Sequence, residues 1–199
     1  MSLYNCVVTQ RVGVVLAGGS GTRFGRTKGD VVVDGVPLAV HAANALRPVC
    51  ATVLISVAPG ASNPAPGYAP IEDAEPAGRG PLAGIEAAFA ATGQADLVVL
   101  ACDYPRVGPE VLEAVLAAAR DTDEMVIATD GRGRDHPLVG LWRRALAAHV
   151  RDALDHGFFK VRALLAEVEV RRVRPADAAG VDLDAALANI NTRADLDLS

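Results

Sequence analysis

The sequence predicts an α/β fold, a doubly wound (Rossmann-like) and mostly parallel sheet with helices on both faces. Short, β-branched apolar runs alternate with longer segments rich in Ala and Leu. The apolar runs show no polar face, which is typical of parallel strands buried on both sides. The chain has 199 residues, enough for a single domain with a substantial core, so residues 1–199 are expected to form one domain.

The expected strands are four apolar runs, and the expected helices lie between them. The strands are residues 12–17, 52–57, 96–102 and 124–129. The helices are residues 37–46, 81–92 and 108–120, with Pro37, Pro81 and Pro109 near their starts. In a doubly wound sheet, ligands bind beyond the carboxyl ends of the strands, so the segments that follow these runs are the candidates for a site.

Other segments depart from this alternation. Residues 31–37 are expected to form a short strand that ends in an Asp-Gly turn. Residues 58–81 hold six of the twelve prolines and are expected to be a loop of functional importance. Residues 158–168 are expected to form a helix and residues 169–175 an edge strand. Three aromatic side chains are expected in the core: Trp142, Phe158 and Phe159.

Composition excludes several classes of function. The formal net charge is −5, which argues against a nucleic-acid groove, since such grooves are basic. The three cysteines form no C-x-x-C pair, which favours reduced thiols in a cytoplasmic protein. We find neither a signal-peptide pattern nor an apolar run near the roughly 20 residues that span a bilayer, so no membrane partner is expected.

The segment after the first strand is rich in glycine and positive charge. It lacks the third glycine of a dinucleotide fingerprint and the Lys-Ser/Thr pair of a Walker A loop. Consecutive glycines still let backbone N–H groups approach phosphate oxygens, and basic side chains add charge-assisted hydrogen bonds. We favour a phosphate site over a tight connection with solvated basic residues. The residues concerned are Gly18, Gly19, Gly21, Arg23, Gly25 and Lys28.

Asp103 follows the third strand, where a carboxylate is suited to hold Mg²⁺ against a triphosphate. The alternative is a turn or helix-capping aspartate before Pro105. Residues 80–84 open a helix whose N-terminus either faces an anion or is an ordinary helix start, and both interpretations remain open. Asp73 is an acidic loop residue whose role the residues alone leave undecided.

Two later segments are candidates for a second substrate. Residues 130–137 carry Arg132, Arg134 and His136, which suit a phosphate; a solvated loop is the alternative. Asn189 and Asn191 offer amides suited to a heterocycle such as a pterin, although Asn-rich turns are common.

Five motifs in order resemble those of the molybdenum cofactor guanylyltransferases (MobA-type proteins) of the nucleotidyltransferase superfamily. "LAGGSGTRFGRTK" (16–28) resembles L-A-G-G-x-S-x-R-M-G-x-D-K, although Gly21 and Thr27 replace the family's serine and aspartate. The other four are "IEDAEPAGRGPLAG" (71–84), "LACDYP" (100–105), "RDHPLVGLWR" (134–143) and "NINTRADL" (189–196). The resemblance covers nearly the whole chain.

The resemblance implies transfer of GMP from GTP to the phosphate of molybdopterin, with release of pyrophosphate. It implies Arg23, Lys28 and Asp103 as catalytic residues, with Asp103 holding Mg²⁺. The implied nucleotide-binding residues are Leu16, Ala17, Gly18, Gly19, Gly21, Lys28, Ser56, Asp73 and Gly84, with Ser56 where some relatives carry a base-contacting asparagine. The implied acceptor-binding residues are Arg134, His136, Asn189 and Asn191. Transient contact with molybdenum-inserting or molybdoenzyme-maturation proteins is a further expectation.

Two alternatives stay open at this point. One is a related nucleotidyltransferase that acts on another phosphorylated acceptor, of the cytidylyltransferase or sugar-phosphate type. The other is a nucleotide-binding regulator without catalysis, against which the joint presence of Arg23, Lys28 and Asp103 argues.

Overall fold

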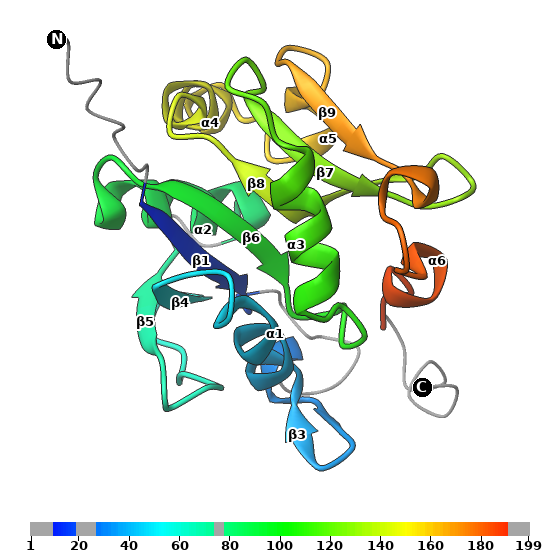
Figure 1. Cartoon of the computed structure of the whole chain (residues 1–199). Helices are drawn as coiled ribbons and strands as arrows, with labels where there is room; N and C mark the ends of the chain where they lie inside the picture. The colour runs from blue at the N-terminus through cyan, green and yellow to red at the C-terminus, as the bar shows by residue number, and fades with distance from the viewer. Residues whose placement is uncertain (1–9, 19–26, 74–77, 191–199) are drawn as a thin grey trace, which may run out of the picture.

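The computed structural model of the protein describes residues 10–18, 27–73 and 78–190. Its centre is a seven-stranded sheet in the order β5-β4-β1-β6-β8-β7-β9 (Figure 1). The strands are β1 (Arg11–Leu16), β4 (Thr52–Val57), β5 (Ala69–Glu72), β6 (Asp96–Ala101), β7 (Met125–Thr129), β8 (Asp135–Trp142) and β9 (Val170–Val173). The four strands predicted from apolar runs are confirmed as β1, β4, β6 and β7, each to within one residue at either end.

The sheet is mostly parallel, with one strand reversed. β5, β4, β1 and β6 pair in parallel, as do β7 and β9, whereas β8 is antiparallel to both β6 and β7. Because β8 runs the other way, its first residues lie at the sheet edge where β6 and β7 end. Thr129 at the end of β7 pairs with Asp135 at the start of β8. This edge therefore collects the ends of six strands and the beginning of one.

Helices cover both faces of the sheet, as predicted. Figure 1 shows α1 and α3 in front of the strands and α2 behind them, and α4 packs against α2. The helices are α1 (Leu38–Leu46), α2 (Pro81–Thr92), α3 (Pro109–Ala118), α4 (Leu146–Asp155), α5 (Val161–Leu164) and α6 (Leu183–Ala186). Two 3₁₀ turns complete the set: η1 (Lys28–Asp30) and η2 (Pro175–Asp177). None of the helices in the described ranges is both long enough and apolar enough to cross a bilayer.

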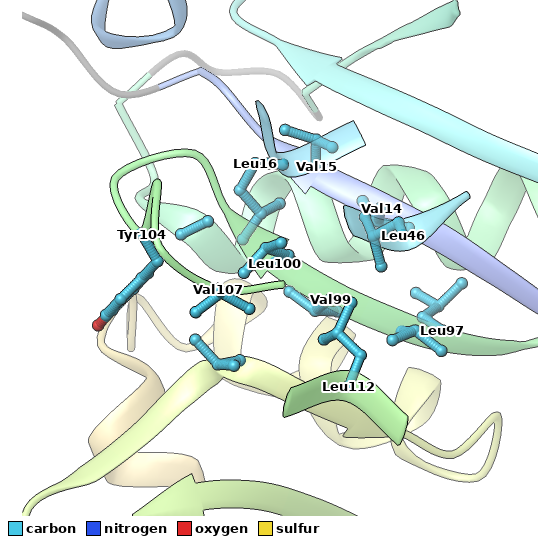
Figure 2. Packing of buried hydrophobic residues seen from close by; sticks show 14 of the residues in the cluster. Val14, Val15, Leu16, Leu46, Leu97, Val99, Leu100, Tyr104, Val107 and Leu112 are labelled. Atoms are coloured by element: carbon cyan, nitrogen blue, oxygen red, sulfur yellow. The ribbon is translucent and has the colours of Figure 1, made fainter. Parts of the chain in front are cut away.

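The core lies between the sheet and its helices. Side chains of β1 and β6 meet Leu46 of α1 and Leu112 of α3 in one buried cluster (Figure 2). Trp142 is fully buried, which confirms its predicted place in the core. Burial of this continuous apolar surface is the main force that stabilises the packing of the helices on the sheet, at roughly 25 cal/mol per Å² of apolar area removed from water.

Several predictions for irregular segments need correction. The segment 58–81 was expected to be a loop, but Ala69–Glu72 forms β5. As the last strand of the sheet, β5 tolerates Pro70, because an edge strand can leave one side of its backbone unpaired. The turn predicted at Asp34 and Gly35 is confirmed: both have positive φ, and the turn joins β2 (Val32–Val33) to β3 (Val36–Pro37).

Further corrections concern the second half of the chain. Residues 135–137 belong to β8 rather than to a loop, and the helix expected over 158–168 is limited to α5. The edge strand expected over 169–175 is confirmed as β9. Phe158 and Phe159 are 59% and 40% exposed, so their predicted core position is wrong. They follow α4 in a turn where the Phe159 ring is covered on one face by the guanidinium of Arg79, 5.7 Å from the ring centre.

Candidate functional site

The candidate site is built at the carboxyl edge of the sheet, just beyond β1, β4 and β6. The strand pattern of hydrogen bonds continues past the strand ends, since Ala17 N donates to Ser56 O (2.9 Å) and Cys102 N donates to Leu16 O (3.2 Å). These bonds hold the segments after the three strands side by side. Three of the residues predicted to bind the nucleotide, Leu16, Ala17 and Ser56, therefore stand next to one another at this edge.

Asp103 and Lys28 form an ion pair at the centre of this edge. Lys28 Nζ lies 3.0 Å from Asp103 Oδ2, and the two side chains are 20% and 17% exposed. They are 75 residues apart in the sequence: η1 carries Lys28, and the turn after β6 carries Asp103. The structure thus brings together two residues that the sequence predicted to be catalytic.

One carboxylate oxygen of Asp103 is left over. Oδ1 is buried and, within the described residues, has no hydrogen-bond partner. A buried carboxylate oxygen without a partner is costly, and such atoms call for an explanation such as an absent ion. No group of three or more His, Cys, Asp and Glu side chains in these ranges is arranged to hold a metal. The unpartnered Oδ1 of Asp103 fits a cation such as Mg²⁺, which is commonly bound through one or two carboxylates together with substrate phosphates and water.

The neighbouring thiol takes no part in this chemistry. Burial, with the charge of Asp103 as a second cause, raises the pKa of the Cys102 thiol to about 12. The thiol is therefore protonated at neutral pH and is a poor nucleophile, since the thiolate is the reactive form.

A second carboxylate, Asp73, lies in a narrow cradle beside β4. Ser56 is 1% exposed, and its hydroxyl donates to Asp73 Oδ1. A Cβ on Gly84 of α2 would lie 2.9 Å from Asp73 Oδ1 and would also collide with the Ser56 hydroxyl, and a Cβ on Gly18 would lie 2.5 Å from Asp73 Oδ2. A side chain at either position would displace this carboxylate, so the two glycines let α2 and the end of β1 approach it in its present place.

The environment of Asp73 tunes its charge. Burial raises the pKa of the Asp73 carboxyl above its ordinary value, and the hydrogen bond from Ser56 acts in the opposite direction. Ser56 is buried beneath Asp73 and Gly84, so its role is to hold the Asp73 carboxylate in place. The sequence left two interpretations open for residues 80–84, an anion site and an ordinary helix start. The close approach at Gly84 gives this helix start a further role, which is to shape the space around Asp73.

A cavity of about 560 Å³ opens where β7 ends and β8 begins. Its lining comes from the loop after β7, the start of β8, and α6 with the segment that follows. The lining residues are Asp130, Gly131, Arg132, Arg134, His136, Asp184, Leu187, Ala188 and Asn189. Three of the four residues predicted to bind the acceptor are among them: Arg134, His136 and Asn189.

The segment after α6, which forms one wall of the cavity, is hydrogen-bonded to the segment that carries Asp103. Ile190 N donates to Asp103 O at 2.8 Å, so the residue after Asn189 lies against the backbone of the candidate metal ligand. At the other end of the same wall, Gly131 N donates to Asp184 Oδ1 at 2.7 Å and ties the β7–β8 loop to α6. The cavity and the Lys28–Asp103 pair are thus adjoining parts of one site.

His136 is placed at the cavity by an irregularity in the sheet. The register between β7 and β8 shifts between Ile127 and Ala128, which pair with Gly140 and His136 respectively. Such bulges re-aim side chains and are frequent beside active sites. His136 is 2% exposed, and burial lowers the pKa of its imidazole below the ordinary value, with the charge of Arg134 acting in the same direction and Asp130 opposing it.

Some predicted residues lie outside the described ranges, and some cavity residues were not predicted. Gly19, Gly21, Arg23 and Asn191 fall outside the described residues. Sequence reasoning missed Tyr104, Asp130 and Asp184. Tyr104 directly follows Asp103, and Asp130 ends an apolar run, so their positions beyond strand ends were a signal that could have identified them.

Comparisons with known proteins identify the family of the chain. A family model described as a MobA-like NTP transferase domain matches residues 13–173, from β1 to the end of β9. The chain is 34% identical over 151 residues to the molybdenum cofactor guanylyltransferase of Shewanella loihica, covering 74% of this chain and 76% of that protein. It is 34% identical over 191 residues to a probable molybdenum cofactor guanylyltransferase of Mycobacterium marinum, covering 92% of this chain and 90% of that protein.

Solved structures share the fold. The molybdopterin-guanine dinucleotide biosynthesis protein A of Archaeoglobus fulgidus superposes with a TM-score of 0.74 at 25% identity, covering 94% of this chain and 95% of that one. A Mycobacterium tuberculosis protein in complex with manganese superposes with a TM-score of 0.63 at 19% identity, covering 83% and 88%. The second likeness concerns the fold alone.

Proposed function

The chain belongs to the MobA-like NTP transferase family, and from this premise we propose that it transfers GMP from GTP to the phosphate of molybdopterin, with release of pyrophosphate. The observation that carries the proposal is the position of Asp103. Its side chain pairs with Lys28, and its backbone carbonyl holds Ile190 beside the cavity. A residue so placed stands between a nucleotide site and an acceptor site. The names of the relatives support GTP as the nucleotide.

The reaction needs little proton transfer. An oxygen of the acceptor phosphate, already anionic, attacks the α-phosphorus of GTP while the bond to the pyrophosphate group breaks. Catalysis then rests on positioning and on the neutralisation of negative charge. In this scheme Lys28 stabilises the charge that develops as pyrophosphate leaves, and Arg23 is proposed to share that role.

The two carboxylates of the site, Asp103 and Asp73, have different proposed ligands. A divalent cation such as Mg²⁺, held by Asp103, would add positive charge at the phosphate oxygens, and the unpartnered Oδ1 supports this assignment. Asp73 is proposed to accept hydrogen bonds from the guanine base, with Gly18 and Gly84 leaving room for the carboxylate and Ser56 supporting it. Leu16 and Ala17, with Gly19 and Gly21, are proposed to complete the nucleotide site.

The cavity is the proposed acceptor site. Its volume of about 560 Å³ lies in the range of pockets that hold a drug-sized ligand. Arg134 offers charge to a phosphate, and Asn189 offers an amide to the edge of a pterin. Asn191 is proposed to act with them. The two described cysteines are free thiols, which supports a cytoplasmic setting for the reaction.

Pyrophosphate release is the experiment that tests the proposal. Purified protein is incubated with Mg²⁺, molybdopterin or its molybdenum form, and GTP, CTP or ATP in turn. Release with GTP alone is the expected result. Release with CTP alone would assign the protein to cytidylyl transfer, and release only with a sugar phosphate as acceptor would replace molybdopterin. Nucleotide binding without release from any acceptor would contradict catalysis.

Lys28→Ala separates turnover from binding. We expect the turnover number to fall by about 10²-fold or more, since the ammonium group acts mainly on charge that develops in the transition state. The dissociation constant for GTP should rise by less than about tenfold. Arg47→Ala, which removes an exposed charge after α1, is the control and should change neither quantity. Unchanged turnover in Lys28→Ala would remove Lys28 from the mechanism.

A further inference from the structure

A chain of three polar side chains runs from the Asp103 segment to the cavity. The Tyr104 hydroxyl lies 3.1 Å from His136 Nδ1, and His136 Nε2 lies 3.4 Å from Asp130 Oδ2. Tyr104 and His136 are 8% and 2% exposed. The Tyr104 ring packs at the margin of the apolar cluster with its hydroxyl pointing away from the cluster (Figure 2). The three side chains therefore connect two parts of the site, since Tyr104 follows Asp103 and Asp130 lines the cavity.

The rules of hydrogen bonding determine which atoms of these three side chains carry protons. An ionised carboxylate only accepts, so Asp130 requires a proton on His136 Nε2. Because burial lowers the pKa of His136, the ring is neutral and carries one N–H, which leaves Nδ1 as an acceptor. A tyrosine hydroxyl keeps its proton at neutral pH, since its ordinary pKa is about 10, so the Tyr104 hydroxyl donates to Nδ1.

Asp130 is held independently of the histidine. Its Oδ1 accepts from the backbone N–H groups of Arg132 (3.0 Å) and Arg134 (2.8 Å). These two bonds shape the loop and, together with His136, lower the pKa of the Asp130 carboxyl. The contact from His136 to Oδ2 is long by comparison, and both residues line the cavity. The His136 ring is thus held more loosely at Nε2, by Asp130, which lines the cavity, than at Nδ1, by Tyr104, which is not among the lining residues.

We infer that Tyr104 is a positioning residue that holds His136 in its Nε2–H form, so that His136 presents this N–H to a phosphate oxygen of the substrate in the cavity. The assignment of the cavity to the acceptor rests on the proposed function; the proton arrangement does not. His136 thus adds a neutral donor beside the cationic side chain of Arg134. This positioning role accounts for the burial of a tyrosine hydroxyl directly after the candidate metal ligand.

The first test reads the proton arrangement without catalysis. Nitrogen-15 NMR of the full chain distinguishes the two neutral forms of a histidine ring. We expect the Nε2–H form for His136 in the wild type and in Tyr68→Phe, a matched control in which an exposed tyrosine hydroxyl loses its bond to Asn44. In Tyr104→Phe we expect a mixture of both forms. A wild-type Nδ1–H form, or an unchanged signal in Tyr104→Phe, would overturn the inference.

The second test uses inorganic phosphate as the probe of the cavity. We expect the His136 Nε2–H signal to respond to phosphate in a saturable manner. In Tyr104→Phe, half-saturation of this signal should need about tenfold more phosphate, which is the change in affinity expected when one hydrogen bond loses its orientation. His136→Gln, whose amide nitrogen can replace Nε2, should bind phosphate more tightly than His136→Ala. A His136 signal that ignores phosphate would overturn the role in the cavity.

The third test separates this inference from the proposed function. With saturating GTP, Tyr104→Phe should raise the KM for the acceptor about tenfold while kcat stays within about twofold. A merely structural role would instead lower thermal stability and the active fraction without a selective change in the acceptor KM. An active wild type with an unchanged acceptor KM in Tyr104→Phe would contradict the inference alone. An inactive wild type with the expected NMR results would contradict the proposed function alone.

Discussion

Strand β6 has an aspartate near each of its ends: Asp96 begins the strand, and Asp103 lies two residues beyond it. The Asp96 side chain is 4% exposed and both of its oxygens are bonded, Oδ2 to Arg143 Nη1 (2.9 Å) and Oδ1 to Arg144 N (2.8 Å). The Asp103 side chain is 17% exposed, pairs through Oδ2 with Lys28, and leaves Oδ1 without a partner among the described residues.

The difference shows how one strand carries a structural and a functional carboxylate. Arg143 and Arg144 follow β8, so the satisfied Asp96 fastens β6 to its antiparallel neighbour at the amino edge. Asp103 lies at the carboxyl edge, where segments from distant parts of the chain meet. A carboxylate with an unbonded oxygen at this edge is suited to bind a ligand, whereas a fully bonded one stabilises the fold.

The largest expected effect is that of Asp103→Asn. The substitution keeps the size of the side chain but removes the charge that we assign to metal and substrate phosphates. We expect the turnover number to fall by about 10²- to 10³-fold. The free energy of unfolding should change by less than about 1 kcal/mol, because the amide removes the charge on the buried, unpartnered Oδ1, which offsets the loss of the ion pair with Lys28. Pyrophosphate release and urea unfolding measure the two quantities, and turnover within threefold of the wild type would refute the role of Asp103.

Asp96→Asn should show the opposite pattern. It leaves the guanidinium of Arg143 without a counter-charge in a site that is mostly buried. Removal of one partner from a buried pair is strongly destabilising, and the partial exposure of Arg143 reduces the expected loss to about 2 kcal/mol. Turnover per folded molecule should stay unchanged. If urea unfolding shows no loss of stability while activity falls, the comparison between the two aspartates is wrong.

Gly84→Ala tests the second carboxylate of the site. A methyl group there meets Asp73 Oδ1 and the Ser56 hydroxyl, so we expect GTP to bind about tenfold more weakly in calorimetric titration. The helix itself should not suffer, because alanine is favoured over glycine in a helix by about 1 kcal/mol. Gly67→Ala is the matched control, since a methyl group at residue 67 enters open space. Equal affinities in the two variants would remove the cradle around Asp73 from nucleotide binding.

The smallest expected effect concerns pH. Burial lowers the pKa of His136 in the folded protein, so the unfolded chain takes up the proton at a higher pH, near 6.5. The contribution to stability is therefore complete above about pH 6.5 and is lost as the pH falls from there through the folded pKa. The groups that face His136 are Tyr104, Asp130, Arg134 and Asp135.

Urea unfolding at pH 7.5 and pH 5.5 measures this contribution. The stability lost between the two pH values should be smaller in His136→Gln than in the wild type, because the variant has no imidazole to protonate. A larger loss in the variant would contradict the sign derived from burial.

Local sequence patterns were sufficient for the regular part of the fold. Continuous apolar runs predicted β1, β4, β6 and β7, because a strand buried on both faces has no reason to carry polar residues. The strand β8 was missed for the opposite reason. It starts with polar residues, contains Pro137 and Gly140, and is interrupted by the register shift opposite Ile127, so its local pattern is weak.

The sequence predicted those residues of the candidate site that directly follow a recognisable strand. Asp103 and Lys28 were predicted separately, but the 3.0 Å contact between them depends on how η1 folds back over the sheet edge. Tyr104 and Asp130 were missed, because nothing in a sequence says that two segments 26 residues apart place a hydroxyl and a carboxylate on the same imidazole. The exposure of Phe158 and Phe159 was equally hidden, since apolar residues alone do not indicate where the core ends.

The sequence by itself determined the alternation of strands and helices and the chemical types of side chain at the strand ends. Both depend on neighbours along the chain, through periodicity and the conformational preferences of glycine and proline. Tertiary structure alone decided which of those side chains share a site. The antiparallel β8 carries His136 to the edge where β6 leaves Asp103, and that reversal depends on pairing between residues about forty positions apart, which no local pattern encodes.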